Sequence, residues 1–182
     1  MSRSPSAPDM PVYLVEYDPC WPARFIEERE QIVRVLSGQD VDVEHIGSTA
    51  IPGMAARPII DIMVLIDDIA ASTPCIEQLK TLEYDYYPYG EDVFAERRWL
   101  CKPSQAERTH HQHLVERNSP FHRDHLLFRD YLRMHTDAAR RYESLKRQLV
   151  DRYRNDRDGY TDEKSDFVAS ILRMARAEKL HR

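Results

Sequence analysis

The chain has 182 residues, of which 42% are hydrophobic and 31% charged, and its net charge is −5 at neutral pH. This length and composition fit one soluble globular domain with a proper hydrophobic core. The acidic balance argues against nucleic acid as a partner, because proteins that coat it need an excess of Lys and Arg. The longest apolar run, over 59–66, is too short to span a bilayer, so we expect no membrane association.

Three cysteines, Cys20, Cys75 and Cys101, are far apart and odd in number. They indicate neither a disulfide framework nor a zinc site built from paired cysteines. Reduced thiols are typical of the cytoplasm, where we expect this protein to act. The first ten residues lack the apolar core of a signal peptide, and residues 1–11 are expected to form a disordered lead-in. These patterns leave the oligomeric state open.

From residue 12 the chain alternates strand-like and helix-like patterns. An amphipathic helix is expected over 21–36, because apolar residues recur at helical spacing and Gly38 follows at the usual stop position. The segment over 59–66 is almost continuously apolar, which predicts a strand in the interior of a sheet. The other expected elements are an extended segment over 12–17, strands over 41–46, 93–101 and 111–116, a turn or short helix over 47–56, and a helix over 73–82.

After residue 120 only helical patterns follow. Three helices are expected, over 121–134, 137–153 and 162–177. A mixture of strands and helices followed by helices alone predicts an α+β fold with a helical C-terminal layer. We therefore expect a single domain over 12–182, with a mixed core over 12–119 and a helical part over 120–178.

A Gly-Ser pair directly after one strand, with an acid on the next, is the most informative feature. The turn formed by Gly47, Ser48 and Thr49 lets backbone N–H groups and hydroxyls approach a phosphate. Asp61 can then hold a divalent cation against that phosphate. Because Asp61 stands among isoleucines, its charge is costly unless a cation or hydrogen bonds compensate it. The alternative is an ordinary turn beside a solvent-facing carboxylate.

Two further side chains are candidates for the same site. If strand 41–46 pairs with strand 59–66, Glu44 lies near Asp61 and supplies a second metal ligand, whereas a salt bridge from Glu44 to Arg57 or another arginine is the alternative. His111 and His113 share one strand face, which suits a metal or phosphate contact. We expect Glu44, Asp61 and His113, together with Ser48, to line one cavity.

Three cations are candidate phosphate ligands. Arg57 and Arg98 carry guanidinium groups suited to bidentate contact with phosphate, and Lys164 stands at the start of an expected helix. For each of them taken alone, a solvated surface position is the alternative.

Two blocks of the sequence resemble the GrpB family. The first is EHIGSTAIPG over 44–53 followed by RPIIDI over 57–62, and the second is FRDYLR over 128–133 with Ala138, Tyr142, Leu145 and Lys146. The resemblance extends over about 12–177. It implies a nucleotidyltransferase-like fold in a family sometimes fused to dephospho-coenzyme A kinase, and it implies fold more firmly than function.

The wider nucleotidyltransferase pattern fits only in part. Gly47, Ser48 and Asp61 match its turn and its first acid, but Met63 stands where the second acid belongs. Glu116 is the candidate for the third acid, although strand parity places it on the opposite face from His113. Two-metal transfer in its usual form is therefore not indicated.

The leading hypothesis is a metal-dependent nucleotidyltransferase, or a related nucleotide-dependent group transfer. A nucleoside triphosphate and an unknown small acceptor are its expected partners, Asp61 and Glu44 would bind Mg²⁺ or Mn²⁺, and His113 completes the catalytic candidates. Met63 suggests one alternative, a non-catalytic nucleotide- or phosphate-binding protein. The other is a single-metal enzyme of another class that uses Glu44, Asp61, His111 and His113.

Overall fold

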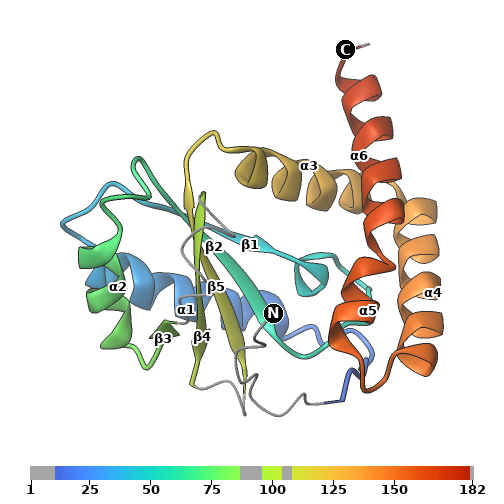
Figure 1. Cartoon of the computed structure of the whole chain (residues 1–182), viewed down its shortest axis with the longest axis horizontal. Helices are drawn as coiled ribbons and strands as arrows, with labels where there is room; N and C mark the ends of the chain where they lie inside the picture. Colours follow the sequence, from blue (N-terminus) through green and yellow to red (C-terminus); the bar gives the residue numbers. More distant parts are fainter. Residues whose placement is uncertain (1–10, 87–95, 104–107, 181–182) are drawn as a thin grey trace, which may run out of the picture.

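The computed structural model describes residues 11–86, 96–103 and 108–180, and it shows a mixed sheet with helices on both faces (Figure 1). The predicted α+β class with a helical C-terminal layer is confirmed. Residues 1–10 of the lead-in predicted over 1–11, and the first residues of the strand predicted over 93–101, lie outside the described residues. In chain order the elements are α1 (Trp21–Val35), β1 (Asp42–Ile46), the 3₁₀ helix η1 (Ser48–Ala50), β2 (Ile60–Ile66), α2 (Thr73–Lys80), β3 (Asp85–Tyr86), β4 (Arg97–Lys102), β5 (His110–Glu116), α3 (Pro120–Met134), α4 (Thr136–Arg152), α5 (Arg157–Asp162) and α6 (Ser165–Leu180).

The five strands lie in the order β1-β2-β5-β4-β3. β2 runs parallel to β5, whereas every other neighbouring pair is antiparallel. The prediction that 59–66 forms an interior strand is confirmed, since β2 is paired on both sides. Its register sets the site, because Asp61 stands between Ile46 and His111, while Met63 stands between Glu44 and His113.

One face of the sheet is closed by α1 and α2. We call it the closed face, and it carries Ile62, Val64, Leu100 and Leu114. These side chains pack with Trp21 and other apolar residues of the two helices into the largest buried cluster. This arrangement explains the continuous apolar run of β2, since one half of its side chains faces this core.

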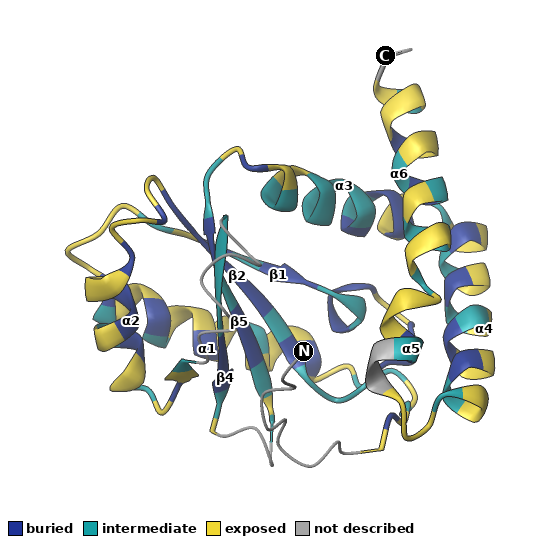
Figure 2. Ribbon diagram, viewed as in Figure 1, coloured by how far each residue is buried: buried dark blue, intermediate teal, exposed yellow. Residues whose placement is uncertain are grey.

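The opposite face, which we call the Asp61 face, is covered over part of its area by α3. Ile46, Met63 and Val115 form a small apolar cluster there, and Phe121 and Leu126 of α3 pack over it. Figure 2 shows that β2 is buried along most of its length. The remainder of this face carries the polar side chains of the candidate site.

The C-terminal helices form a separate layer beside the sheet (Figure 1). Residues of α3, α4 and α6 pack around the segment that follows η1, where Ile51 and Met54 are buried against Tyr131, Tyr142 and Ile171. The segment between the Gly-Ser turn and β2 is therefore held by the helical layer as well as by the sheet.

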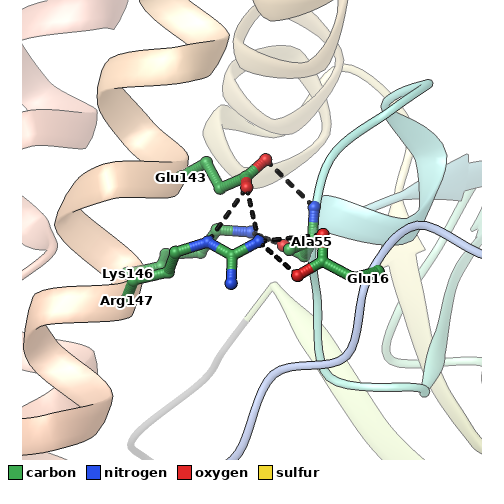
Figure 3. Close-up of polar contacts among 5 residues, drawn as sticks. All are labelled: Glu16, Ala55, Glu143, Lys146 and Arg147. Carbon is green, nitrogen blue, oxygen red and sulfur yellow. Dashed lines mark hydrogen bonds and ion pairs between the residues drawn. The ribbon is translucent and has the colours of Figure 1, made fainter.

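Polar contacts fasten α4 to that segment (Figure 3). A carboxylate oxygen of Glu143 accepts a hydrogen bond from the N–H of Ala55 at 3.1 Å, and Lys146 Nζ donates to the carbonyl of Ala55 at 2.5 Å. Arg147 donates to both Glu143 and Glu16 at 2.8 Å. Both backbone groups of Ala55 thus have partners on α4, which fixes the approach of this helix to the core.

Two details differ from the sequence-based expectation. The helix expected over 162–177 is α6, which begins at Ser165, and the short helix α5 before it was not expected. The two are separated by a tight turn, where the N–H of Lys164 donates to the carbonyl of Thr161. The short strand β3 was not expected, because its aromatic-rich surroundings resemble a turn. No described helix is long and apolar enough to cross a membrane.

Candidate functional site

A cavity of about 510 Å³ opens where the Gly-Ser turn, the start of β2 and the C-terminal helices meet. Aromatic side chains line it, from α3 (Phe121, Phe128), α4 (Tyr142) and α5 (Tyr160). Its cationic lining residues are Arg57, Arg129, Lys146 and Lys164, and its acidic ones are Asp61, Glu96 and Asp124. The cavity therefore offers apolar ring surface and charges of both signs.

Gly47 brings the backbone of the turn against the carboxylate of Asp61. Its φ is +71°, and a Cβ at this position would lie 2.2 Å from Asp61 Oδ2. Only glycine combines this conformation with this approach. Ser48 and Thr49 follow as the start of η1, and all three residues of the turn line the cavity.

Thr49 is committed to contacts inside the protein. Its hydroxyl donates to the carbonyl of Ile59 at 3.3 Å and lies 3.0 Å from His45 Nε2. Burial lowers the pKa of His45 to about 4, and the charge of Asp61 offsets only part of that effect. His45 is therefore a neutral, packed histidine that positions Thr49, and the backbone of Thr49 is the part left to meet a ligand.

Asp61 is an ionised carboxylate with a hydrogen-bonding partner. Its Oδ1 lies 3.0 Å from Nδ1 of His111, on the neighbouring strand β5. Burial raises the pKa of Asp61, but the hydrogen bond and charge of His111, with His113 and Arg57, outweigh it and lower the pKa to about 2. Of the two kinds of compensation expected for this carboxylate, a cation or hydrogen bonds, the structure supplies a hydrogen bond from a histidine.

Glu44 lies on the Asp61 face, as its strand parity predicts, but it is paired elsewhere. Its Oε2 accepts a hydrogen bond from Arg129 Nη1 at 2.7 Å, and the same guanidinium donates to the carbonyl of His45 and to Asp130. Glu44 is not among the residues that line the cavity. The alternative of a salt bridge to an arginine is the arrangement found.

The positions considered for the second and third acids of the nucleotidyltransferase pattern lie away from the cavity. Met63 is fully buried in the apolar cluster beneath α3. Glu116 lies on the closed face of the sheet, where it accepts a hydrogen bond from the N–H of Ile69 at 3.3 Å. Within the described ranges, no group of three or more His, Cys, Asp or Glu side chains could hold a metal ion. These residues do not fit a two-metal centre.

His113 and Arg98 are placed away from the cavity lining. His113 shares the face of Asp61, packs 5.4 Å from the ring of Phe121, and has Nδ1 3.4 Å from a guanidinium nitrogen of Arg97. Burial, with the charge of Arg97, keeps the pKa of His113 well below its usual range. Arg98 lies on the closed face of the sheet and donates a hydrogen bond to the carbonyl of Arg97. The structure brings together the other phosphate candidates, Gly47, Ser48, Thr49, Arg57 and Lys164.

Lys146 and Tyr142 are cavity residues that the sequence alone did not single out as site residues. Both belong to the buried face of α4, and the spacing of Tyr142, Lys146 and Leu149 is that of one helix face. A lysine within such an apolar stripe was the available signal. Burial lowers the pKa of Lys146 to about 7 and raises that of Tyr142.

A model of the GrpB protein family matches residues 11–174 of this chain. The UPF0157 protein YqkA of Bacillus subtilis is 37% identical over 172 residues, which are 94% of this chain and 49% of YqkA. The chain therefore spans about half the length of that relative. The crystal structure of the conserved protein GrpB from Enterococcus faecalis is 34% identical, with a TM-score of 0.82 over 92% of this chain and 99% of that one.

A more distant structural neighbour is the Cid1 poly(U) polymerase, with a TM-score of 0.49 and 13% identity over 76% of this chain and 43% of that one. Similarity at this level transfers no activity from that enzyme to this chain.

Proposed function

This chain belongs to the GrpB family, and we propose that its cavity binds a nucleotide or a closely related phosphorylated small molecule. The observation that carries this proposal is the convergence of a Gly-Ser turn, cationic side chains and aromatic rings on one cavity. A pocket of this size with a few convergent charged groups is the usual form of a small-molecule site.

The two kinds of lining suit the two parts of a nucleotide. Arg57 and Lys164, which line the same cavity as Ser48, supply positive charge and hydrogen-bond donors for phosphate oxygens. The rings of Phe121 and Phe128, both on α3, supply apolar surface for a base, since aromatic side chains stack readily on heterocycles.

Asp61 gives the cavity a fixed negative charge, because its lowered pKa keeps it ionised throughout the physiological range. One carboxylate together with ligand phosphates is a usual environment for a single Mg²⁺ ion. Asp61 therefore fits a single ion that arrives with the nucleotide and neutralises its phosphate charge. Met63 and Glu44 add no second protein carboxylate, which favours binding over two-metal transfer.

Nucleotidyl transfer, or a related group transfer to a small acceptor, is the second candidate function. One observation favours it, namely that Asp61 and the Gly47-Ser48 turn are in direct contact at the cavity. In such a reaction this chain would contribute positioning and charge neutralisation.

A thermal-shift screen of nucleoside triphosphates, with and without Mg²⁺ or Mn²⁺, tests the proposal. Ligand at about a hundred times its dissociation constant adds roughly 2.7 kcal/mol of stability, which raises Tm by about 5–10 °C in a domain of this size. Arg57→Met should remove most of that shift. Lys80→Met is the matched control, because Lys80 pairs with Glu77 on the exposed surface of α2.

Two outcomes contradict the proposal: a screen in which no nucleoside triphosphate raises Tm, and a shift that survives Arg57→Met unchanged. Chromatography of the nucleotide after incubation with the protein separates the two candidate functions, because binding alone leaves the nucleotide intact. Nucleotidyl transfer releases pyrophosphate only when an acceptor is present.

A further inference from the structure

We propose that Lys146, with Arg57 and Lys164, forms the anion subsite of the cavity, and that binding of a phosphate there is coupled to uptake of one proton by the Lys146 amine. This inference rests on the proposed function, because it places the phosphates of the ligand at the end of the cavity formed by α4 and the α5–α6 junction.

Lys146 reaches the cavity from the buried face of α4. The residue is only 2% exposed, and its Nζ donates to the carbonyl of Ala55 at 2.5 Å (Figure 3). The same Nζ lies 5.1 Å from the centre of the Tyr142 ring. A lysine ammonium has three donors, and the bond to Ala55 uses one of them. The amine is thus fixed in place at the cavity wall.

The charges around Lys146 are mostly positive. Arg147 lies on the same helix, Arg57 on the segment before β2, and Lys164 at the α5–α6 junction, whereas Glu143 is the acid that faces it. Glu143 is also engaged by the N–H of Ala55 and by Arg147. Two tyrosines, Tyr142 and Tyr160, add aromatic rings but no charge at neutral pH.

Burial and this surplus of positive charge make the amine easy to deprotonate. Burial has the largest effect, the repulsion from Lys164, Arg147 and Arg57 adds to it, Glu143 opposes it, and the pKa of Lys146 falls to about 7. At pH 8 most of the Lys146 side chains are therefore neutral in the free protein.

A bound phosphate reverses this balance. An anion beside the amine favours the ammonium form and raises its pKa, so the amine takes up a proton as the ligand binds. In the pH range between the free and bound pKa values, the affinity should rise on the order of tenfold for each unit that the pH falls. The subsite therefore makes the affinity for a phosphorylated ligand depend on pH just above neutrality.

Calorimetry at pH 8.0 in two buffers of different ionisation enthalpy measures this proton directly. The probe is ATP, or whichever nucleoside triphosphate stabilises the protein most in the screen above, because its terminal phosphate carries almost no titrating proton at that pH. Wild type should take up more than about half a proton for each ligand bound, because most Lys146 amines are neutral before binding and charged after it.

Lys146→Arg is the matched variant, since arginine is cationic at every pH used. It should retain binding within about tenfold and lose the proton uptake. Lys146→Met should lose about tenfold or more in affinity, because a charge-assisted hydrogen bond is removed.

Wild-type binding without net proton uptake would overturn the inference and leave the proposed function standing, and so would an uptake that persists in Lys146→Arg. If no nucleoside triphosphate binds to wild type, the proposed function fails first. The wild-type measurement decides the matter even if a variant does not fold.

Discussion

Asp61 and Met63 project from the same face of β2 into two different environments. Asp61 lies against the Gly47 turn and the cavity, with His111 on Oδ1. Met63, two residues further on, is fully buried beneath α3 with Ile46 and Val115. Both side chains point to the same face of β2. Their environments differ because the Gly47 turn covers Asp61, whereas α3 covers Met63.

The two faces of the sheet extend this contrast (Figure 2). The closed face is sealed by α1 and α2 over one large apolar core. The Asp61 face is divided between a small apolar cluster and a polar region with ionised Asp61, its partner His111 and the neutral His113. The closed face therefore holds the larger buried apolar core, and the Asp61 face holds the polar side chains of the candidate site.

Met63→Asp should remove the difference between the two positions, and of the changes below it should destabilise the protein most. The change restores the second acid of the nucleotidyltransferase pattern, but it places a carboxylate in an apolar cluster and should destabilise the fold by about 4 kcal/mol or more. Met63→Leu, which conserves volume, should cost less than about 1.5 kcal/mol. Urea denaturation measures both. A stable Met63→Asp protein that binds Mg²⁺ would show that this position belongs to an open metal site.

Gly47→Ala should have the next largest effect, a destabilisation of about 3 kcal/mol. Part of this cost is the positive φ, and part is the overlap with the carboxylate of Asp61. Gly53→Ala is the comparison, because Gly53 also has a positive φ, +76°, but no described atom lies within 4 Å of a methyl group at this position, and it should cost about 1 kcal/mol. Thermal unfolding measures both variants. Equal costs for the two would mean that the close approach of Gly47 to Asp61 is absent in solution.

Acidification should destabilise the protein through its buried histidines. The folded-state pKa of His45 is lowered to about 4. The stability that its neutral form contributes is therefore fully present above about pH 6.5 and is lost as the pH falls towards 4. This amounts to at most about 3 kcal/mol. The lowered pKa values of His113 and His125 act in the same direction.

Urea denaturation at pH 7.5 and pH 4.5 tests the effect of acid. His45→Gln, which can still hydrogen-bond to Thr49, should show a smaller loss of stability between the two values. An equal loss in wild type and His45→Gln would mean that other groups cause the acid sensitivity.

Asp61→Asn should have the smallest effect on stability, about 1–2 kcal/mol of destabilisation, because the fold stabilises the ionised form and lowers its pKa to about 2. Asp137→Asn is the control, since Asp137 is almost fully exposed, and it should change stability by less than about 0.5 kcal/mol. Thermal unfolding compares the two. A gain in stability for Asp61→Asn would show that the carboxylate is not compensated in the folded protein.

The local elements of this fold could be predicted from the sequence, because their signals are local. The bounds predicted from the apolar run of β2 and from the helical spacing of α1, α3 and α4 lie close to the observed ones. The Gly47-Ser48 turn and Asp61 were likewise readable, since a few neighbouring residues determine them.

The pairing of charges could not be predicted in the same way. Arg129 stands 85 residues from Glu44, and Lys146 stands 91 residues from Ala55. The apolar stripe of α4 around Lys146 indicates that this lysine is buried, but no local pattern names the partner of either cation. Only the docking of α3 and α4 on the core decides that Glu44 is neutralised and that Lys146 enters the cavity.

The most direct test of the central claim is a crystal structure of the protein with a bound non-hydrolysable nucleoside triphosphate. We expect phosphates beside the Ser48 turn, within reach of Arg57, Lys146 and Lys164, and a base against the aromatic rings of the cavity. A nucleotide bound elsewhere, with this cavity holding only solvent at saturating ligand, would contradict it.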